Sequence, residues 1–334
     1  MIYFDQASAI RPAAEVLDFY RETAEKNFWN QESAHAFAYR LRQDLQKAGE
    51  ELAIALTGRS MRVCWGCSGT DVLWAAGRIF SGRKGGVQLS NMVHPAVEAA
   101  FAACDSGKTP TLTVFPHVES ETGIMVSKPE SGLILCDAIQ SAGKLFPLPE
   151  ADFIAVSGNK LGGMGGGALL YSDEAFDRLF AQLRTEHLLS RPEPAQCLTL
   201  AYAAKLAVNR KQENEAKVRE ISDFLRTELA GTPLPGGSKV QPTVPAEKAS
   251  PYILHLLLPG IQTGVLVRML GEMGAACSAG SACAAESTEP SRILQAMGHA
   301  GNAYSGLRLS FGPDNTMDEA RAFVKIFQQA IREY

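Results

Sequence analysis

The sequence lacks the features of membrane, secreted and nucleic-acid-binding proteins. No apolar run approaches the roughly 18 residues that a membrane-spanning helix needs, so no membrane segment is predicted. The first residues show no basic stretch followed by an apolar one, so no secretory signal is recognised. The 32 Lys and Arg residues stand against 36 Asp and Glu residues, which gives a net charge of −4. This balance speaks against a nucleic-acid partner, because such proteins usually carry a basic excess.

Cysteine and histidine are also scarce. The seven cysteines are odd in number and scattered, which favours a reducing cytoplasm over a disulfide framework. The six histidines include no HExxH pair, and the single CxxC pair, Cys64 and Cys67, has no second pair to complete a zinc site. We therefore expect a cytoplasmic protein without a bound metal.

What the sequence does contain is a regular alternation of short apolar runs and longer helical patterns. This alternation predicts an α/β fold with a mostly parallel sheet. The expected strands are residues 61–65, 86–89, 111–115, 132–137, 152–156, 167–171, 252–257 and 306–311. The expected helices are residues 32–57, 70–80, 95–103, 194–230, 264–273 and 317–334. The 334 residues allow two domains, and we expect a large one over 12–210 and a small one over 211–334, with residues 1–11 packing on the small one.

A lysine stands directly before a glycine-rich loop. The apolar run 152–156 leads into Ser157-Gly-Asn-Lys160, and five of the six residues 162–167 are glycine. Glycines let the backbone turn sharply and approach a ligand closely. A plain hairpin turn with a solvated lysine would explain the same residues, and the motif alone does not decide between the two.

Two further motifs place an acid and an anion cradle at strand ends. Asp137 ends an apolar run, where open α/β sheets place ligand groups, although a helix N-cap would explain it too. Ser68-Gly69-Thr70 joins a strand to a helix, and the free N–H groups of such a turn bind anions, although many ordinary turns look alike. A lysine, an acid and a phosphate cradle together are what pyridoxal 5'-phosphate requires.

Two more candidates lie in the last third of the chain. Cys283 follows a run of small residues ahead of a helix expected to begin at 289–290, and an exposed loop cysteine is a candidate nucleophile. An incidental small residue would also explain it. Cys277 ends a strand and is expected to be packed. Arg308 lies inside an apolar strand, where it is more natural as a bidentate partner of a carboxylate than as core.

Together these motifs resemble the NifS-like cysteine desulfurases of the class V aminotransferase family. The resemblance runs from Tyr3-Phe-Asp5-Gln-Ala-Ser8 to Arg308, and its most specific part is Gly280-Ser-Ala-Cys283 with Glu289-Pro-Ser291. It implies a pyridoxal-phosphate-dependent transferase fold and a homodimer. It also implies conversion of L-cysteine to L-alanine, with a persulfide on Cys283 that is passed to an acceptor protein.

The resemblance also implies a role for each matched residue. Lys160 would hold the cofactor covalently, Asp137 would pair with its pyridine nitrogen, and Cys283 would accept the sulfur. His94 would stack on the ring and, with Lys160, move protons. The remaining implied contacts are Gln140 to the phenolic oxygen, Gly69, Thr70, Ser157 and Asn159 at the phosphate, and Arg308 to the substrate carboxylate.

The sequence departs from the family at three places. Asn159 stands where the family usually has His. The family's Asn-Asn-Glu-Ile-Gly stretch is His117-Val-Glu119-Ser-Glu-Thr-Gly123 here, so an asparagine near the cofactor oxygen is missing. The segments by which a second subunit holds the phosphate are reduced to Ser190-Arg191-Pro. Two alternatives therefore stay open. One is a class V aminotransferase or lyase, such as a selenocysteine lyase, in which Cys283 is incidental. The other is a non-enzymatic protein of this fold in a sulfur-transfer assembly.

Overall fold

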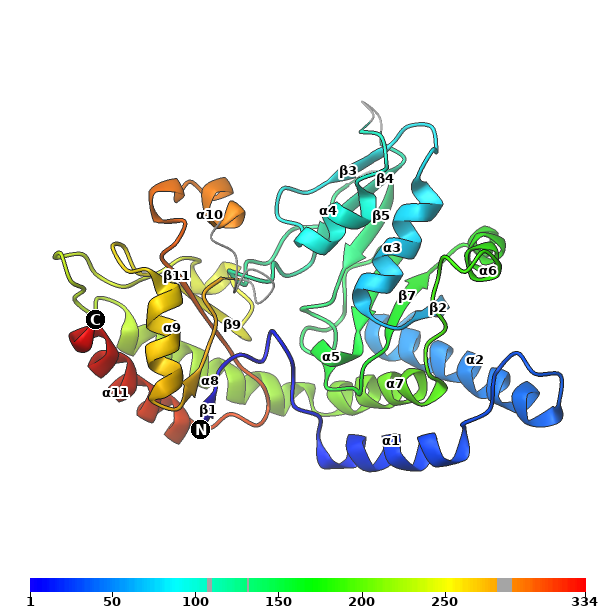
Figure 1. Cartoon of the computed structure of the whole chain (residues 1–334), viewed down its shortest axis with the longest axis horizontal. Helices are drawn as coiled ribbons and strands as arrows, with labels where there is room; N and C mark the ends of the chain where they lie inside the picture. The colour runs from blue at the N-terminus through cyan, green and yellow to red at the C-terminus, as the bar shows by residue number, and fades with distance from the viewer. Residues whose placement is uncertain (107–109, 131, 281–289) are drawn as a thin grey trace. The chain divides into compact units, whose positions relative to one another are not determined.

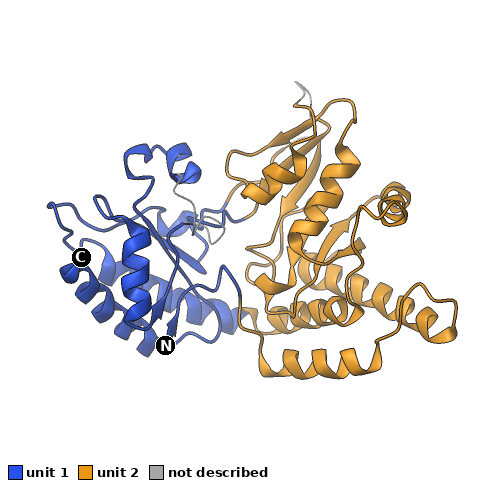
Figure 2. Cartoon of the chain, in the orientation of Figure 1, with its two compact units in different colours: residues 1–9, 118–125, 212–334 blue, residues 10–117, 126–211 orange. Residues whose placement is uncertain are grey.

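A computed structural model describes residues 1–106, 110–130, 132–280 and 290–334 of the chain. The chain divides into two compact units, coloured separately in Figure 2. Unit 1 comprises residues 1–9, 118–125 and 212–334, and unit 2 comprises residues 10–117 and 126–211. The chain therefore enters unit 1 for a short segment in the middle of unit 2, which the sequence pattern does not reveal.

Unit 2 is built on a six-stranded sheet with strand order β2-β7-β6-β5-β4-β3 (Figure 1). Strands β3 to β6 run parallel to one another, whereas β7 runs antiparallel to both of its neighbours. Helices cover both faces, so most strand residues are buried and read in the sequence as continuous apolar runs. The predicted α/β class with a mostly parallel sheet is confirmed. The strands are β2 (Arg62–Gly66), β3 (Val87–Leu89), β4 (Leu112–Pro116), β5 (Leu133–Asp137), β6 (Phe153–Ser157) and β7 (Gly167–Tyr171).

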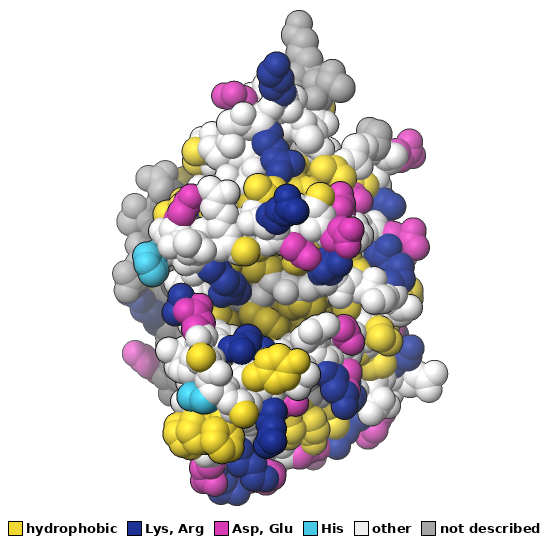
Figure 3. Space-filling model, turned by 90° about the vertical axis from the view of Figure 1, so that its right-hand side faces the viewer, with side chains coloured by type: hydrophobic (Ala, Val, Ile, Leu, Met, Phe, Trp, Pro, Cys, Tyr) yellow, Lys and Arg dark blue, Asp and Glu magenta, His cyan; other side chains and the backbone are white. Residues whose placement is uncertain are grey.

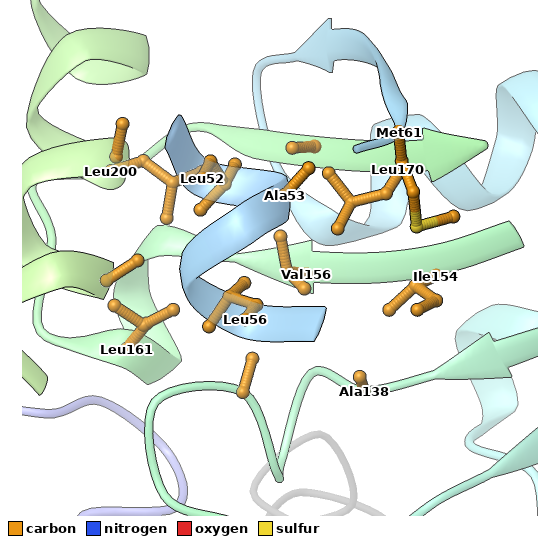
Figure 4. Close-up of a cluster of buried hydrophobic side chains, with 14 of the residues drawn as sticks. Leu52, Ala53, Leu56, Met61, Ala138, Ile154, Val156, Leu161, Leu170 and Leu200 are labelled. Atoms are coloured by element: carbon orange, nitrogen blue, oxygen red, sulfur yellow. The ribbon is translucent and has the colours of Figure 1, made fainter. Parts of the chain in front are cut away.

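The side chains of each strand alternate between two hydrophobic cores. On β6, Ile154 and Val156 pack with helices α2 and α7, whereas Phe153 and Ala155 pack with α3 and α4. Figure 4 shows Leu56 and its neighbours on α2 against the first of these layers. The helices of unit 2 are α1 (Ala14–Lys26), α2 (Ala36–Thr57), α3 (Gly69–Phe80), α4 (Pro95–Phe101), α5 (Gly158–Leu161), α6 (Asp177–Thr185) and α7 (Pro194–Asn209).

In its described residues, unit 1 combines a small antiparallel sheet with four α-helices. Its three strands have the order β11-β9-β8, and β1 pairs separately with β10 in parallel. Phe4, next to β1, packs its ring on Phe311 and Phe323 at centroid distances of 5.2 and 5.3 Å, which fastens the N-terminal segment to this unit. The strands are β1 (Ile2–Tyr3), β8 (Gln241–Pro242), β9 (Ile253–Leu257), β10 (Ala275–Ala276) and β11 (Gly306–Ser310). The helices are α8 (Lys211–Leu229), α9 (Thr263–Glu272), α10 (Arg292–Ala296) and α11 (Met317–Glu333).

The prediction of one helix over residues 194–230 is wrong. Two helices occupy this stretch, because Arg210 leaves the helical conformation with φ −104° and ψ 7°. No Gly or Pro marks the break in the sequence. The break coincides with the boundary between the units: α7 packs in the core of unit 2, and nearly all of α8 belongs to unit 1. Helices α1 and α6 were not predicted at all. Within the described parts of the chain, none of the helices is long and apolar enough to cross a membrane.

Candidate active site

The ends of several strands meet at one edge of the unit 2 sheet. Strands β4, β5 and β6 are parallel, so their carboxyl ends share this edge. Ser157, the last residue of β6, pairs with Gly167, the first residue of β7, and Gly167 also pairs with Gly66 at the end of β2. Asp137, the last residue of β5, pairs with Ala155. The motifs around residues 68, 137 and 157, far apart in sequence, are therefore neighbours, and this edge is where open α/β sheets bind ligands.

The start of α3 forms a tight cradle at this edge. The Ser68 hydroxyl caps the helix by accepting a hydrogen bond from the Asp71 N–H at 3.1 Å. A Cβ atom on Gly69 would lie 3.0 Å from the Ser157 Cβ, and one on Gly167 would lie 2.2 Å from the Ser68 carbonyl carbon. Only glycine fits at Gly167, where the obstacle is backbone, and the approach at Gly69 places the first turn of α3 beside Ser157. Such a helix start stabilises an anion.

Asp137 is a buried carboxylate at the end of β5, with 7% of its surface exposed. Its Oδ1 accepts a hydrogen bond from the Ile139 N–H at 3.0 Å, which is a local turn contact and not the cap of a regular helix. Burial raises its pKa from 3.8 to about 6, although the Ile139 N–H acts in the opposite direction. A cationic N–H group beside this carboxylate would favour its charged form.

Lys160 lies on α5, the single helical turn that follows β6, and its side chain is partly buried. The glycine loop folds back over the start of this turn. A Cβ atom on Gly158 would lie 1.9 Å from the Gly165 carbonyl oxygen, and Gly165 has φ +91°, which favours glycine. The connection does join two antiparallel strands, as the hairpin alternative supposed, but it contains a helical turn and a lysine that is not fully solvated.

Two histidines lie near the same sheet edge. His94 caps α4, and its Nδ1 accepts a hydrogen bond from the Ala96 N–H at 3.1 Å. The neutral ring therefore carries its proton on Nε2. His117 follows β4, and its N–H donates to the Asp137 carbonyl at 3.0 Å. Burial lowers the pKa of His117, and its Nδ1 has no hydrogen-bond partner among the described residues. The sequence motifs assign His117 no role, although a histidine directly after an apolar strand is a usable signal.

In unit 1, Arg308 is bound by groups of the chain itself. It is 1% exposed, and its Nη2 donates to Asp5 Oδ1 at 2.8 Å and to Ser8 Oγ at 2.8 Å. Its Nη1 donates to the Ser120 carbonyl at 2.9 Å. Arg308 does have a carboxylate partner, as its place in an apolar strand predicts, and in this structure that partner is Asp5.

Of the two cysteines singled out in the last third of the chain, the structure describes Cys277. Cys277 is 8% exposed directly after β10, and burial raises its pKa to about 12. The prediction that it is packed is confirmed, and a thiol with such a pKa is a poor nucleophile at neutral pH. Cys283 lies outside the described residues.

Unit 2 also has an open groove of about 830 Å³ along its edge strand β2. Figure 3 shows hydrophobic side chains in a hollow on this face, with charged side chains around it. The groove runs along the side of β2, and none of the sequence-predicted site residues lines it. Its lining includes Leu45, Met61, Val63, Trp65 and Phe180, with Arg42, Arg62 and Asp177 among the charged residues.

Comparison with known proteins agrees with this fold and sequence pattern. No family model matches the chain. A NifS/IcsS protein homolog of Lactobacillus delbrueckii subsp. bulgaricus is 25% identical over an alignment of 384 residues, which covers 100% of this chain and 98% of that protein. An IscS-like cysteine desulfurase of Mycobacterium tuberculosis is 31% identical over 207 residues, and the match spans 58% of this chain but only 51% of that relative. A solved NifS-like protein from Rickettsia africae has a TM-score of 0.82 at 18% identity and covers 99% of both chains.

The chain is similar to NifS-like cysteine desulfurases in sequence, at low identity, and in fold. The NifS-like fold extends over both units, because the structural match covers nearly the whole chain. At this identity the match shows the fold, and the candidate site is described by its own geometry. That geometry brings the cradle at Gly69, the acid Asp137 and the strand end before Lys160 to one sheet edge.

Proposed function

We propose that the protein is a pyridoxal-phosphate-dependent cysteine desulfurase. It would convert L-cysteine to L-alanine and leave the sulfur as a persulfide on Cys283. The observation that carries the proposal is the meeting of three groups at the carboxyl edge of the unit 2 sheet: the start of α3, the buried Asp137 and the strand end that leads to Lys160. The cysteine desulfurases among the relatives support the choice of reaction.

The residues present fit pyridoxal phosphate. The start of α3 would offer N–H groups to the phosphate. Thr70 follows Gly69 in this first turn, and the Ser157 Cβ lies beside it, so their hydroxyls are candidates for further phosphate contacts. Asp137 is a carboxylate whose burial would be offset by the protonated ring nitrogen. Lys160 is the lysine of the turn that follows Ser157. When bound, the cofactor supplies an electron sink for the substrate's α-carbon.

Each residue then has a defined task. Asp137 holds a proton on the ring nitrogen, and Lys160 binds the cofactor and afterwards moves a proton at the substrate α-carbon. His94, whose neutral ring carries its proton on Nε2, can donate from that atom. By the family resemblance, Gln140 would contact the phenolic oxygen of the cofactor and Asn159 its phosphate. Arg308 would bind the substrate carboxylate, for which Asp5 in this structure is the competing partner.

The sulfur step is assigned to Cys283 by its match to the family motif. Its thiolate attacks the substrate sulfur, so a sulfur–sulfur bond forms and the carbon–sulfur bond breaks. The electron pair of the broken bond stays with the substrate's β-carbon, which takes up a proton to become the methyl group of alanine. We further propose a cytoplasmic homodimer that hands the persulfide sulfur to an acceptor protein. The family resemblance supports this extension.

The test is to incubate the purified protein with pyridoxal phosphate, L-cysteine and a reductant, and to assay sulfide and alanine together. We expect equal amounts of both products. Lys160→Ala should show neither product and no visible absorbance from covalently bound cofactor. A keto acid without sulfide would favour the aminotransferase alternative. A wild-type protein that takes up no cofactor would favour the non-enzymatic one.

A further inference from the structure

Three neighbouring strands of unit 1 place a row of polar side chains on one face of the small sheet. His255 lies in the central strand β9, directly opposite Arg308 of β11. On the other side of β9, the N–H of Thr243, just after β8, donates to the His255 carbonyl at 3.0 Å. Residues opposite each other on adjacent strands point to the same face of a sheet. Thr243 and Arg308 therefore flank the His255 side chain.

The His255 ring is closely packed and shielded from solvent. Its side chain is 0% exposed, and a Cβ atom on Gly306 would lie 2.6 Å from its Nε2. Its Nδ1 forms a hydrogen bond with Thr243 Oγ1 at 2.7 Å. A hydroxyl group can both donate and accept, so this bond is compatible with a ring proton on either nitrogen. The group that faces Nε2 therefore decides the tautomer of the ring.

The group that faces Nε2 is the carboxyl of Glu121, whose Oε1 lies 4.0 Å away. Both atoms are buried, and neither has a hydrogen-bond partner among the described residues. Buried polar atoms without a partner are costly, which favours a hydrogen bond between these two. The bond requires the carboxyl to move about 1 Å closer to the ring.

The surroundings of the pair place the titrating proton on Glu121. Burial is the largest influence on both groups, and it raises the pKa of Glu121 to about 7 and lowers the pKa of His255 to about 3. Near neutral pH the carboxyl therefore gains or loses a proton, whereas the ring stays neutral. The charged or titratable groups that face the pair are Glu119, Arg292, His299 and Arg308, and the Ser291 hydroxyl donates to Glu121.

We propose that Thr243, His255 and Glu121 form a proton relay, in which the neutral His255 ring changes tautomer whenever Glu121 gains or loses its proton. In the protonated state, the Glu121 O–H donates to Nε2 and the Nδ1–H donates to Thr243. When the proton is lost, Nε2 takes it from Glu121, Nδ1 passes its own proton to the Thr243 oxygen, and the hydroxyl releases its former proton to water. The Nε2–H then donates to the Glu121 carboxylate, and the Thr243 O–H donates to Nδ1. One proton leaves, and only Glu121 has changed its charge.

The relay connects a partly exposed residue with a carboxyl in the interior of unit 1. Thr243 is partly exposed, whereas His255 and Glu121 are buried. Arg308 favours the charged form of Glu121, so a charged Glu121 attracts the Arg308 guanidinium in return. The same guanidinium binds Asp5 of the N-terminal segment. The relay therefore sets the charge beside the residue that fastens this segment, and it needs no bound cofactor.

The test is nitrogen NMR of the whole chain with isotopically labelled histidine, because the chemical shift of each ring nitrogen shows whether it carries a proton. The His255→Asn variant identifies the His255 signals by their absence. Between about pH 5 and about pH 9, the wild type should change from a proton on Nδ1 to a proton on Nε2, with a midpoint near the Glu121 pKa of about 7. A ring that keeps the same nitrogen protonated over this range, or that becomes a cation in it, would overturn the relay.

Two variants assign the relay to its members. Glu121→Gln should hold one tautomer at every pH, because its amide does not titrate, whereas the control Glu228→Gln, at an exposed position, should behave as the wild type. A reversal that persists in Glu121→Gln would overturn the role of the carboxyl.

Thr243→Val should keep the proton on Nε2 throughout, because an N–H at Nδ1 would have no acceptor there. Thr243→Ser keeps the hydroxyl and should restore the reversal. A reversal in Thr243→Val would contradict the part of Thr243. If Thr243→Val does not fold, the comparison of the wild type with Glu121→Gln still decides whether the ring follows the carboxyl.

Discussion

Asp137 shows how a single buried residue can be prepared for a ligand. Its pKa of about 6 is well above the ordinary 3.8, because burial disfavours the charge more than the Ile139 N–H favours it. A carboxylate in this state gains most from a cationic partner, since the partner removes the cost of burial. The strand supplies the position of Asp137, and its burial makes a cationic partner favourable.

Asp137→Asn should leave the cofactor bound but make it a poor electron sink. The amide fills the same space and keeps an acceptor for the Ile139 N–H, but it has no charge to hold a proton on the ring nitrogen. We expect turnover of L-cysteine to fall at least about tenfold, or about 1.4 kcal/mol of barrier. Sulfide assays and the absorbance of the bound cofactor measure the two effects separately. Unchanged turnover would reduce Asp137 to a turn-forming residue.

Glu121 predicts a pH dependence of stability in unit 1. It is 6% exposed, and its Oε1 lies 4.0 Å from His255 Nε2. Burial and the nearby Glu119 raise its pKa from 4.5 to about 7, although Ser291, Arg308 and Arg292 act in the opposite direction. The same burial, with Arg308, lowers the pKa of His255 to about 3, so this ring is neutral at pH 5 and above.

Because the folded state binds the Glu121 proton more tightly, its contribution to the free energy of unfolding falls as the pH rises from about 4.5 to about 7. Glu121→Gln should remove this fall, and relative to the wild type it should gain on the order of 3 kcal/mol between pH 4.5 and 8. Urea unfolding at several pH values measures the difference. Glu228→Gln, at an exposed position on α8, is the control. Parallel curves for the wild type and Glu121→Gln would show that Glu121 is charged throughout.

At the scale of elements, the site depends on how closely β7 approaches the start of α3. Gly167 begins β7 and pairs with residues on both sides, at Ser157 and Gly66. A side chain there would meet the backbone of Ser68, which cannot move without displacing the helix start. Strand pairing and helix position are therefore coupled through one glycine.

Gly167→Ala should displace the first turn of α3 and weaken the anion cradle. We expect the affinity for pyridoxal phosphate to fall at least about tenfold, and the overpacking to destabilise the protein by about 1–3 kcal/mol. Equilibrium binding followed by absorbance measures the first effect and thermal unfolding the second. Gly264→Ala on α9 is the matched control, because a Cβ atom there meets nothing within 4 Å. Equal affinities of the two variants would contradict the role of the cradle.

At the scale of the whole molecule, the proposed chemistry is divided between two units. Lys160, Asp137 and the α3 start belong to unit 2, whereas Arg308 belongs to unit 1. Cys283 falls in the stretch of the chain between two described parts of unit 1. Under the proposed function, variants in unit 2 should affect cofactor binding, and variants in unit 1 should affect substrate binding and sulfur transfer.

Cys283→Ser should bind pyridoxal phosphate and L-cysteine as the wild type does, but release sulfide only at background level. Serine keeps the size but has no sulfur to attack with or to carry a persulfide. Cys277→Ser is the matched control and should stay active, because that buried thiol has a pKa of about 12. Mass spectrometry should find the added sulfur on Cys283 of the wild type. Sulfide release that survives in Cys283→Ser would contradict the desulfurase mechanism and leave the cofactor assignment standing.

Much of unit 2 could be predicted from the sequence because its signals are local. The apolar runs that end at Asp137 and before Lys160 are strands β5 and β6, and residues 167–171 form β7 as predicted. The cap at Ser68 and the helix after it also follow from neighbouring residues. These features depend on contacts within a few residues, and the sequence displays them directly.

The sequence by itself determined the α/β class, the strand ends and which residues stand at them. Only the tertiary structure decided which strand ends lie together and which partners the buried charges have. Arg308 meets Asp5 about three hundred positions away, segment 118–125 joins unit 1, and Arg210 ends a helix with no local breaker. The physical reason is that these partners and boundaries depend on which groups the fold buries together. A buried charge needs a partner, and the fold can supply that partner from a distant part of the chain. A helix ends where the surface that it packs against changes. Neither effect can be read from the local sequence.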